Sequence, residues 1–516
     1  MRASRCIRLI SLIALLVAVT NPAMSAADLS GVPAVRELPG IGDVAVPRAE
    51  CGPGSRPETG LQGDVPALDR DTLRSMGGYT CNMSLVGQYA GRGAAAVSAA
   101  HDHCAYVGSF FLGNTLAEGK GVQVLDLSDP AHPRPTADLT EPAMIAGTWE
   151  SLKVHPGRKL LVGTGVPFLW GAGLLSVYDL SDCAHPRLLN PGAGTNLALP
   201  LPMMTHEGGF SPDGLTYWVS GLAPGQLTAV DLADPANPRI VWQGITGVEQ
   251  HGMGFSRDGD RMYIAALSGF SILDIGSVRR RDATPVVRDI SRTYWTDGFL
   301  TQHTIPVTYH GVRHLFVTDE AGSGGVKLFD IAEETAPELV ARIKLEINLP
   351  ENIDRHVQSA LGGAGMSYDP HYCAVDRPDD PTALACGWIS SGIRVFDIRD
   401  PENFREIAYF NPPARTGQLL ELWNSLHAWS SFVGIPVTAL PAALREAMAG
   451  RFDPAQAATP RAGLLTTADM SSDWCLSPPE WRGSQLWVSC SDNGYLVLSL
   501  DNGSYVPPPN QLSTFW

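Results

Sequence analysis

"GVQVLDLSDPAHPRP" (residues 121–135) returns along the chain as "LLSVYDLSDCAHPRLL" (residues 174–189) and "QLTAVDLADPANPRIV" (residues 226–241). Looser copies begin at Phe270, Gly325 and Gly392, and "GYLVLSLDNG" at Gly494 is a seventh copy. Each copy has an alternating apolar stretch, a turn that starts near an aspartate or its equivalent, and the beginning of a second apolar stretch. This pattern predicts two β-strands joined by a tight turn, repeated seven times.

The spacing of the repeats indicates how many strands each unit contains. The aspartates at 126, 179, 231, 274, 330 and 397 lie mostly 43–67 residues apart. Two further strands fit upstream of each copy around an Asp-Gly turn, as in "GGFSPDGLTYWVSG" (residues 208–221). Four strands in each period of this size are typical of a propeller blade. The sequence therefore predicts an all-β fold, a seven-bladed β-propeller, with blades at 92–145, 146–198, 199–246, 247–298, 299–350, 366–413 and 472–500.

The last copy ends before an outer strand, whereas "MSLVGQYAG" (residues 83–91) resembles an outer strand without the three strands that should precede it. We therefore expect an N-terminal strand to close the ring and protect its edges. Residues 82–516 form the predicted propeller, and residues 27–81 form an irregular N-terminal extension. A helical insertion is expected at about 415–469, where "GQLLELWNSLHAWSSF" and "PAALREAMAGRF" have helical spacing.

These repeats resemble the bacterial LVIVD-repeat family, which is named for strands such as "VQVLDLSDP" and "IRVFDIRDP". The resemblance covers roughly residues 80–500. It implies a propeller and an exported setting but no particular reaction.

The first residues have the features of an export signal. Three arginines precede the apolar run 9–19, and small residues follow near 23–27, which predicts a signal peptide over residues 1–26. We expect the mature protein to be periplasmic or secreted, with no transmembrane segment. The formal net charge of −16 argues against nucleic acid as a partner.

Eight cysteines remain beyond the predicted signal, and an even number in an exported chain suggests disulfides. Cys373–Cys386 and Cys475–Cys490 each bracket a predicted hairpin and are paired on that ground. Cys51–Cys81 and Cys104–Cys183 then follow by elimination.

The blades also repeat a histidine. "THEGGFSPDG" and "QHGMGFSRDG" place His206 and His251 five residues before the same turn. Looser alignment gives Glu150, His303, His371 and Asp473 at the equivalent position of four other blades. The first strand of every propeller blade faces the axis, so we expect these side chains to meet in one axial site.

The residue types in this predicted ring favour a transition metal. Neutral imidazoles bind copper, iron or zinc, whereas calcium and magnesium prefer oxygen ligands. We expect His206, His251, His303 and His371 to be the metal ligands, with Glu150 and Asp473 orienting them or moving protons in catalysis. The plan is similar in architecture to the carotenoid cleavage oxygenases and to copper-dependent methanethiol oxidases related to selenium-binding proteins, without their family motifs.

The sequence thus favours a metal-dependent enzyme, a copper or iron oxidoreductase that acts on a small organic molecule. A non-catalytic propeller that binds a protein or glycan is the alternative. A lactonase-like hydrolase is a third possibility, which would require more carboxylates than the predicted ring contains.

Overall fold

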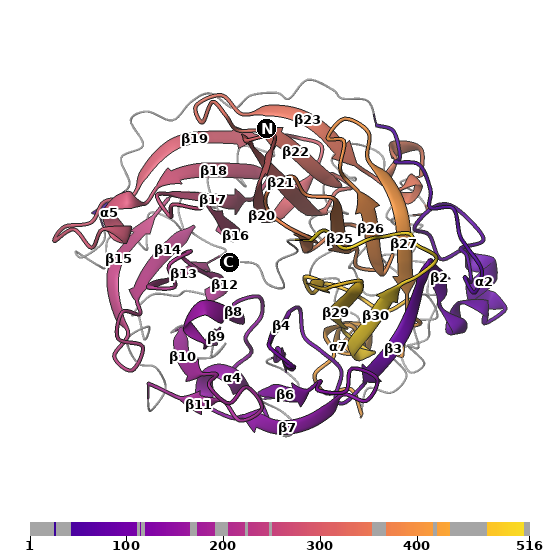
Figure 1. The fold of residues 1–516 in the computed structure, drawn as a ribbon, viewed down its shortest axis with the longest axis horizontal. Helices are drawn as coiled ribbons and strands as arrows, with labels where there is room; N and C mark the ends of the chain where they lie inside the picture. Colours follow the sequence, from indigo (N-terminus) through magenta and orange to yellow (C-terminus); the bar gives the residue numbers. More distant parts are fainter. Residues whose placement is uncertain are drawn as a thin grey trace, which may run out of the picture.

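The structure is a computed structural model that describes residues 25–26, 43–110, 114, 119–165, 173–190, 205–221, 225–246, 250–352, 355, 368–415, 421–433 and 472–509. Seven antiparallel sheets surround one axis (Figure 1). The predicted all-β, seven-bladed propeller is therefore confirmed.

Within each blade the strands follow one another from the axis outwards (Figure 1). The first three blades contain β4 (Ser98–His101), β5 (Cys104–Val107), β6 (Val122–Asp126) and β7 (Arg134–Leu139); β8 (Lys153–His155), β9 (Leu160–Gly165), β10 (Leu174–Asp179) and β11 (Arg187–Leu188); and β12 (Thr205–Phe210), β13 (Thr216–Gly221), β14 (Gln226–Asp231) and β15 (Arg239–Ile245), which β1 (Ser25–Ala26) joins in parallel. The fourth and fifth contain β16 (Gln250–Phe255), β17 (Arg261–Ala266), β18 (Gly269–Asp274) and β19 (Arg288–Tyr294); and β20 (Phe299–Tyr309), β21 (Val312–Ala321), β22 (Val326–Asp330) and β23 (Glu338–Ile343). The sixth contains β24 (Cys373–Val375), β25 (Ala383–Gly387), β26 (Ile393–Asp397) and β27 (Arg405–Asn411), and the seventh contains β28 (Glu480–Arg482), β29 (Gln485–Cys490) and β30 (Gly494–Leu500).

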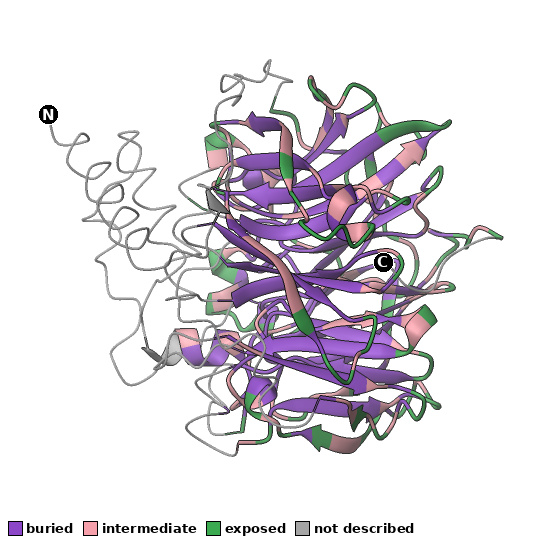
Figure 2. Ribbon diagram, turned by 90° about the vertical axis from the view of Figure 1, so that its left-hand side faces the viewer, coloured by how far each residue is buried: buried purple, intermediate pink, exposed green. Residues whose placement is uncertain are grey.

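The apolar core lies between neighbouring blades. One cluster joins Val162 and Val177 of the second blade to Tyr217 and Val230 of the third, and corresponding clusters occur at other junctions. Figure 2 shows the buried strands across the thickness of the disc, with exposed residues mainly in the connecting turns. Because both faces of the middle strands are covered, runs such as "VQVLD" are apolar with little polar interruption.

The repeated aspartate ends the third strand of six blades and caps the turn that follows. In every one of these turns, the aspartate Oδ1 accepts a hydrogen bond from the backbone N–H two residues later, at 2.7–3.2 Å. This local hydrogen bond explains why the turn repeats with an aspartate. The structure therefore gives this aspartate a local, turn-capping role at the end of the third strand.

The ring is closed by the N-terminal strand, as predicted. β3 (Met83–Tyr89) runs antiparallel to β30 and completes the seventh blade. The four predicted disulfides are also confirmed. Cys373–Cys386 and Cys475–Cys490 lie within blades, and Cys104–Cys183 joins the first blade to the second.

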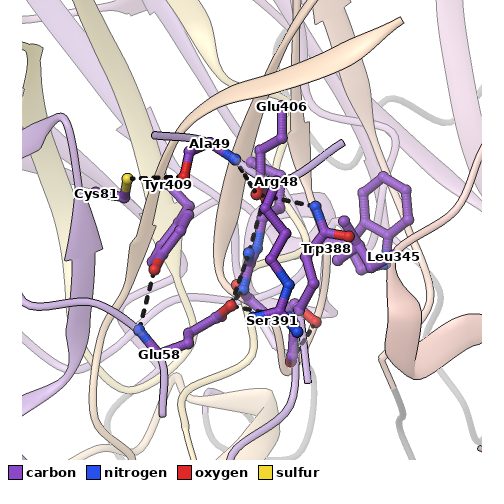
Figure 3. Close-up of polar contacts among 12 residues, drawn as sticks. Arg48, Ala49, Glu58, Cys81, Leu345, Trp388, Ser391, Glu406 and Tyr409 are labelled. Carbon is purple, nitrogen blue, oxygen red and sulfur yellow. Dashed lines mark hydrogen bonds and ion pairs between the residues drawn. The ribbon is translucent and has the colours of Figure 1, made fainter. Parts of the chain in front are cut away.

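The N-terminal extension packs on the sixth blade. β2 (Tyr79–Cys81) adds a fifth strand beside β27, and the Cys51–Cys81 disulfide holds the extension together. The backbone N–H of Glu58 donates to the Tyr409 hydroxyl at 3.0 Å (Figure 3). The Glu58 carboxylate and that of Glu406 both pair with Arg394, which is fully buried. Docking of this segment therefore depends on a buried ion cluster as well as on a strand.

Helices are few and short in the described residues. They are α2 (Ala67–Asp71), α4 (Pro142–Ile145), α5 (Gly276–Arg279) and α7 (Leu426–Val433), with 3₁₀ turns η1 (Arg74–Gly77), η3 (Pro156–Arg158), η5 (Glu346–Asn348) and η6 (Pro350–Asn352). None of the described helices has the length and hydropathy that crossing a bilayer requires. α7 lies in the predicted insertion and packs beside the seventh blade (Figure 1). Residues 1–24 of the predicted signal peptide 1–26, and most of the predicted insertion, including "PAALREAMAGRF", lie outside the described residues.

Candidate metal centre on the propeller axis

Three innermost strands share a local irregularity at the predicted histidine position. The register of β12 shifts between Thr205 and Glu207, that of β16 shifts between Gln250 and Met253, and that of β20 shifts at Thr301/His303. At a β-bulge, two residues on one strand face a single residue on its neighbour, which breaks strict alternation. Consecutive side chains can therefore contribute to the same axial region.

Glu150 is the centre of the site. His206 Nε2 lies 2.8 Å from Glu150 Oε2, and His251 Nε2 lies 3.6 Å from the same oxygen. His371 Nε2 lies 3.0 Å from Glu150 Oε1 and 3.0 Å from Glu320 Oε2. The structure thus brings three of the four candidate histidines, from three different blades, to one carboxylate.

Backbone carbonyls fix the orientation of two of these rings. His251 Nδ1 lies 3.2 Å from the carbonyl oxygen of Thr301, and His371 Nδ1 lies 3.0 Å from that of Leu476. A carbonyl oxygen can only accept, so each Nδ1 carries a hydrogen and each Nε2 is directed at Glu150. This arrangement is typical of histidines that bind a metal through Nε2.

Burial and opposite charges act together on the titration of this group. Burial opposes ionisation of Glu150, but the imidazoles of His206 and His371 outweigh it and hold the pKa of Glu150 well below its usual range. Burial likewise opposes protonation of His371, yet Glu150 and Glu320 raise its pKa to about 10. For His251, burial and the neighbouring His206 lower the pKa. Without a cation the site is therefore balanced by imidazolium ions, and a bound metal would have to replace their protons.

The donor atoms form two groups of three, and each group is close enough to bind an ion after a small contraction. Those of Glu150, His206 and His251 lie within 4.8 Å of one another, and so do those of Glu150, Glu320 and His371. Opposite ligands on one ion lie about 4.2 Å apart, since each bond is about 2.1 Å long. His251 Nε2 is buried and lacks a hydrogen-bond partner among the described residues. The residues present therefore offer two sets of nitrogen and oxygen ligands that share Glu150, and each set fits a transition-metal ion.

His303, the fourth candidate, belongs to a neighbouring polar group. Its Nδ1 lies 3.7 Å from Glu207 Oε1, and its ring centre lies 4.9 Å from that of Tyr372. Lys153 Nζ lies 3.4 Å from the same Glu207 oxygen. Burial lowers the pKa of His303, despite the opposing effect of Glu207. The bulge at Thr301/His303 helps to explain why His303 is separated from Glu150. It directs Gln302 to Glu150 instead, and Gln302 Nε2 donates to Glu150 Oε2 at 2.9 Å.

Asp473 also lies in a different group. Its carboxylate accepts hydrogen bonds from the backbone N–H groups of Asp492 and Asn493, at 2.8 and 2.9 Å. His427 of α7 lies 3.2 Å from Asp492 and 3.7 Å from Asp473, and its ring stacks on Trp474. These partners bind the α7 segment to the seventh blade, so the structure gives Asp473 a positioning role there.

Glu207, Gln302 and Glu320 were not among the predicted site residues. Glu207 directly follows His206, and Gln302 directly precedes His303. If side chains alternated strictly along a strand, both would point away from the axis. Gly208 and Gly209 follow His206, and Gly252 and Gly254 follow His251. Glycine within a strand is a signal of a bulge. Glu320 ends β21 in the run "TDE", where the sequence does not distinguish a ligand from a solvated rim residue.

A channel extends from this region along the axis. The cavity has a volume of about 640 Å³ and is lined by the innermost strands. At one end are Tyr372, His303 and Lys153, and at the other are the exposed side chains of Arg257 and Asp379. The cavity is therefore lined both by exposed residues of the connecting turns and by members of the polar group beside the Glu150 site.

Fold and site define the protein as a seven-bladed propeller with a histidine–carboxylate cluster on its axis. No protein-family model and no curated protein matches the chain. Among solved structures, it is similar to a putative 6-phosphogluconolactonase from Bacteroides uniformis (13% identity, TM-score 0.43, covering 60% of this chain and 83% of that one). It is also similar to the periplasmic gluconolactonase of Pseudomonas aeruginosa (12%, 0.41, 60% and 85%) and to the Cps50 (Swd1) propeller domain of Myceliophteria thermophila (10%, 0.45, 81% and 99%). These similarities concern the propeller architecture alone.

Proposed function

We propose that this protein is an exported metal-dependent enzyme, an oxidoreductase that holds one copper or iron ion through His206, His251 and His371. Glu150 and Glu320 supply the carboxylate ligands. One observation carries the proposal: three imidazole nitrogens converge on the Glu150 carboxylate, and backbone carbonyls hold two of those rings in the ligating orientation. Four disulfides support an oxidising compartment.

The donor set favours a redox metal of intermediate hardness. Imidazole and carboxylate ligands together are found in non-haem iron sites, and imidazole also suits copper(II) and zinc. Two carboxylates would neutralise a divalent ion in this buried region, where an unbalanced charge is costly. When bound, iron or copper would supply one-electron chemistry, while the buried imidazoles and carboxylates fix its ligand geometry and limit access of water.

Metal analysis of the purified full chain tests this proposal. We expect one copper or iron ion per chain in protein isolated without chelators, and electron paramagnetic resonance to identify it. The double variant His206→Ala/His371→Ala should lose the ion, whereas His132→Ala, an exposed histidine in an outer turn, should retain it. Folded protein that takes up none of these metals would refute the proposal and favour the non-catalytic binding propeller.

A metal-dependent hydrolase is a second candidate, because the structure adds Glu207 and Glu320 to the predicted carboxylates. A metal such as zinc lowers the pKa of bound water and produces a nucleophile near neutral pH. The same analysis separates the two classes. Bound zinc with hydrolysis of a test ester or lactone would favour the hydrolase, and a redox-active ion would favour the oxidoreductase.

A further inference from the structure

The two oxygens of the Glu150 carboxylate face two different sets of side chains. Glu150 Oε2 lies 2.8 Å from His206 Nε2 and 3.6 Å from His251 Nε2, which come from the third and fourth blades. Glu150 Oε1 lies 3.0 Å from His371 Nε2 of the sixth blade, and that nitrogen lies 3.0 Å from Glu320 Oε2 of the fifth. One carboxylate therefore belongs to both sets, with a different oxygen in each.

The spacing of the donor atoms suits one ion in each set. Adjacent ligands on a tetrahedral ion lie about 3.4 Å apart when each bond is about 2.1 Å long, and the nitrogen–oxygen distances within the two sets, 2.8–3.6 Å, bracket that value. Among the described residues, no group of donors that all lie within 4.8 Å of one another combines both sets. A single ion would have to draw the two sets together, whereas two ions fit them as they stand.

Each set also contains an imidazole that the backbone already orients. His251 Nδ1 lies 3.2 Å from the carbonyl oxygen of Thr301, and His371 Nδ1 lies 3.0 Å from that of Leu476. Because a carbonyl oxygen only accepts, Nε2 of each ring is the atom left for an ion. In the part of the chain that the structure describes, His251 Nε2 is buried and makes no hydrogen bond. Both sets thus have a nitrogen ligand held in place.

Gln302 restrains the carboxylate that the two sets share. Gln302 Nε2 donates to Glu150 Oε2 at 2.9 Å, and both side chains are buried. A carboxylate oxygen has two lone-pair directions, so Oε2 can accept from Gln302 and still bind an ion. This hydrogen bond opposes rotation of the carboxylate and keeps its two oxygens directed at the two sets.

We propose that this site binds a pair of divalent transition-metal ions, with Glu150 as the ligand that bridges them. His206 and His251 hold the first ion, and His371 and Glu320 hold the second. Ions in two-metal sites lie about 3.5–4 Å apart. Each set supplies three protein ligands, which leaves a position on each ion for water, an anion or a substrate group. This inference rests on the proposed function, which requires one ion at this cluster, and extends it by a second.

Titration of the metal-free full chain with Co²⁺ tests the proposal. We expect two bound ions per chain at saturation, counted by elemental analysis after gel filtration. A carboxylate bridge couples the unpaired electrons of the two ions, so the electron paramagnetic resonance signal per ion should be weaker than in a variant that holds one ion. One ion per chain at saturation would overturn this inference and leave the proposed function intact, whereas no bound ion would refute the proposed function as well. Two ions whose signals simply add would overturn the bridge.

Three variants assign the ligands. Glu320→Gln removes a carboxylate from the second set alone, and His251→Ala removes an imidazole from the first set alone, so each should hold one ion. His185→Ala, an exposed histidine in an outer turn, is the matched control and should hold two. A count of two in Glu320→Gln would contradict the assignment. Thermal unfolding checks that each variant is folded, and the count and coupling in the native chain decide the proposal if one is not.

Discussion

Glu480, on the wall of the channel, makes the stability of the propeller depend on pH. Its carboxylate accepts a hydrogen bond from the backbone N–H of Ala100 at 2.5 Å and lies 3.6 Å from Arg482. Burial raises the pKa of Glu480 to about 7, although Arg482 acts in the opposite direction. We expect replacement by glutamine, which is neutral at every pH and retains the acceptor oxygen, to remove this dependence.

The sign follows from the direction of the change. The folded protein binds the Glu480 proton more tightly than the unfolded chain, whose glutamate titrates at its ordinary value of 4.5. The stabilising contribution is therefore fully present below pH 4.5 and is lost as the pH rises towards 7. Each pKa unit corresponds to about 1.4 kcal/mol, so the free energy of unfolding should fall by up to about 3 kcal/mol across this window.

Urea unfolding of the native chain and of Glu480→Gln, from pH 4.5 to pH 8, measures the effect. The difference between the two free energies removes the contributions of other groups, and the variant should gain relative to the native chain as the pH rises. Glu402→Gln, on the surface, is the matched control. A difference that is constant with pH, or that changes in the opposite direction, would refute the reasoning.

Three further outcomes are expected. Cys104→Ser/Cys183→Ser opens a loop of 79 residues and should lower the free energy of unfolding by about 4.5 kcal/mol according to loop entropy; retained stability in chemical unfolding would contradict this. Arg394→Met leaves two buried carboxylates without their partner and should cost about 3–5 kcal/mol, with faster proteolysis of the N-terminal extension; an unchanged cleavage rate would argue against the clamp. Gly252→Ala would place a Cβ 2.5 Å from Glu207 Oε2 and should destabilise the protein by about 1–3 kcal/mol through overpacking, which a thermal melt would detect; a melting temperature equal to that of the native chain would show that the site can relax.

The fold could be predicted because it repeats. The alternating strands, the capped Asp turns and the truncated seventh copy each have a local physical cause, and together they specify seven blades and their closure. The position of a side chain within a strand is harder to predict, because it assumes regular alternation. Bulges in β12, β16 and β20 break that rule at the axis, which explains why Glu207 and Gln302 were missed and why His303 lies beside Tyr372 rather than Glu150.

Asp473 shows a second limit of reasoning from repeats. The seventh blade lacks the regular first strand near Asp473. The group to which Asp473 belongs includes His427, which comes from the α7 segment. Alignment with other blades cannot anticipate a contact from a segment that they lack. Glu320 likewise comes from the second strand of its blade, so comparison of first strands alone could not include it.

The pairing of β3 with β30 also determines the order in which this chain can fold. Gln88 and Asn493, which are hydrogen-bonded across that pair, are separated by 405 positions. Closing a loop of that length costs about 3 kcal/mol more in chain entropy than closing a 13-residue hairpin. The pairing of β3 with β30 also cannot form until the final blade has been synthesised. We therefore expect ring closure to come late in folding, and β3 lacks its partner strand until β30 has been made, which leaves an open strand edge in the nascent chain.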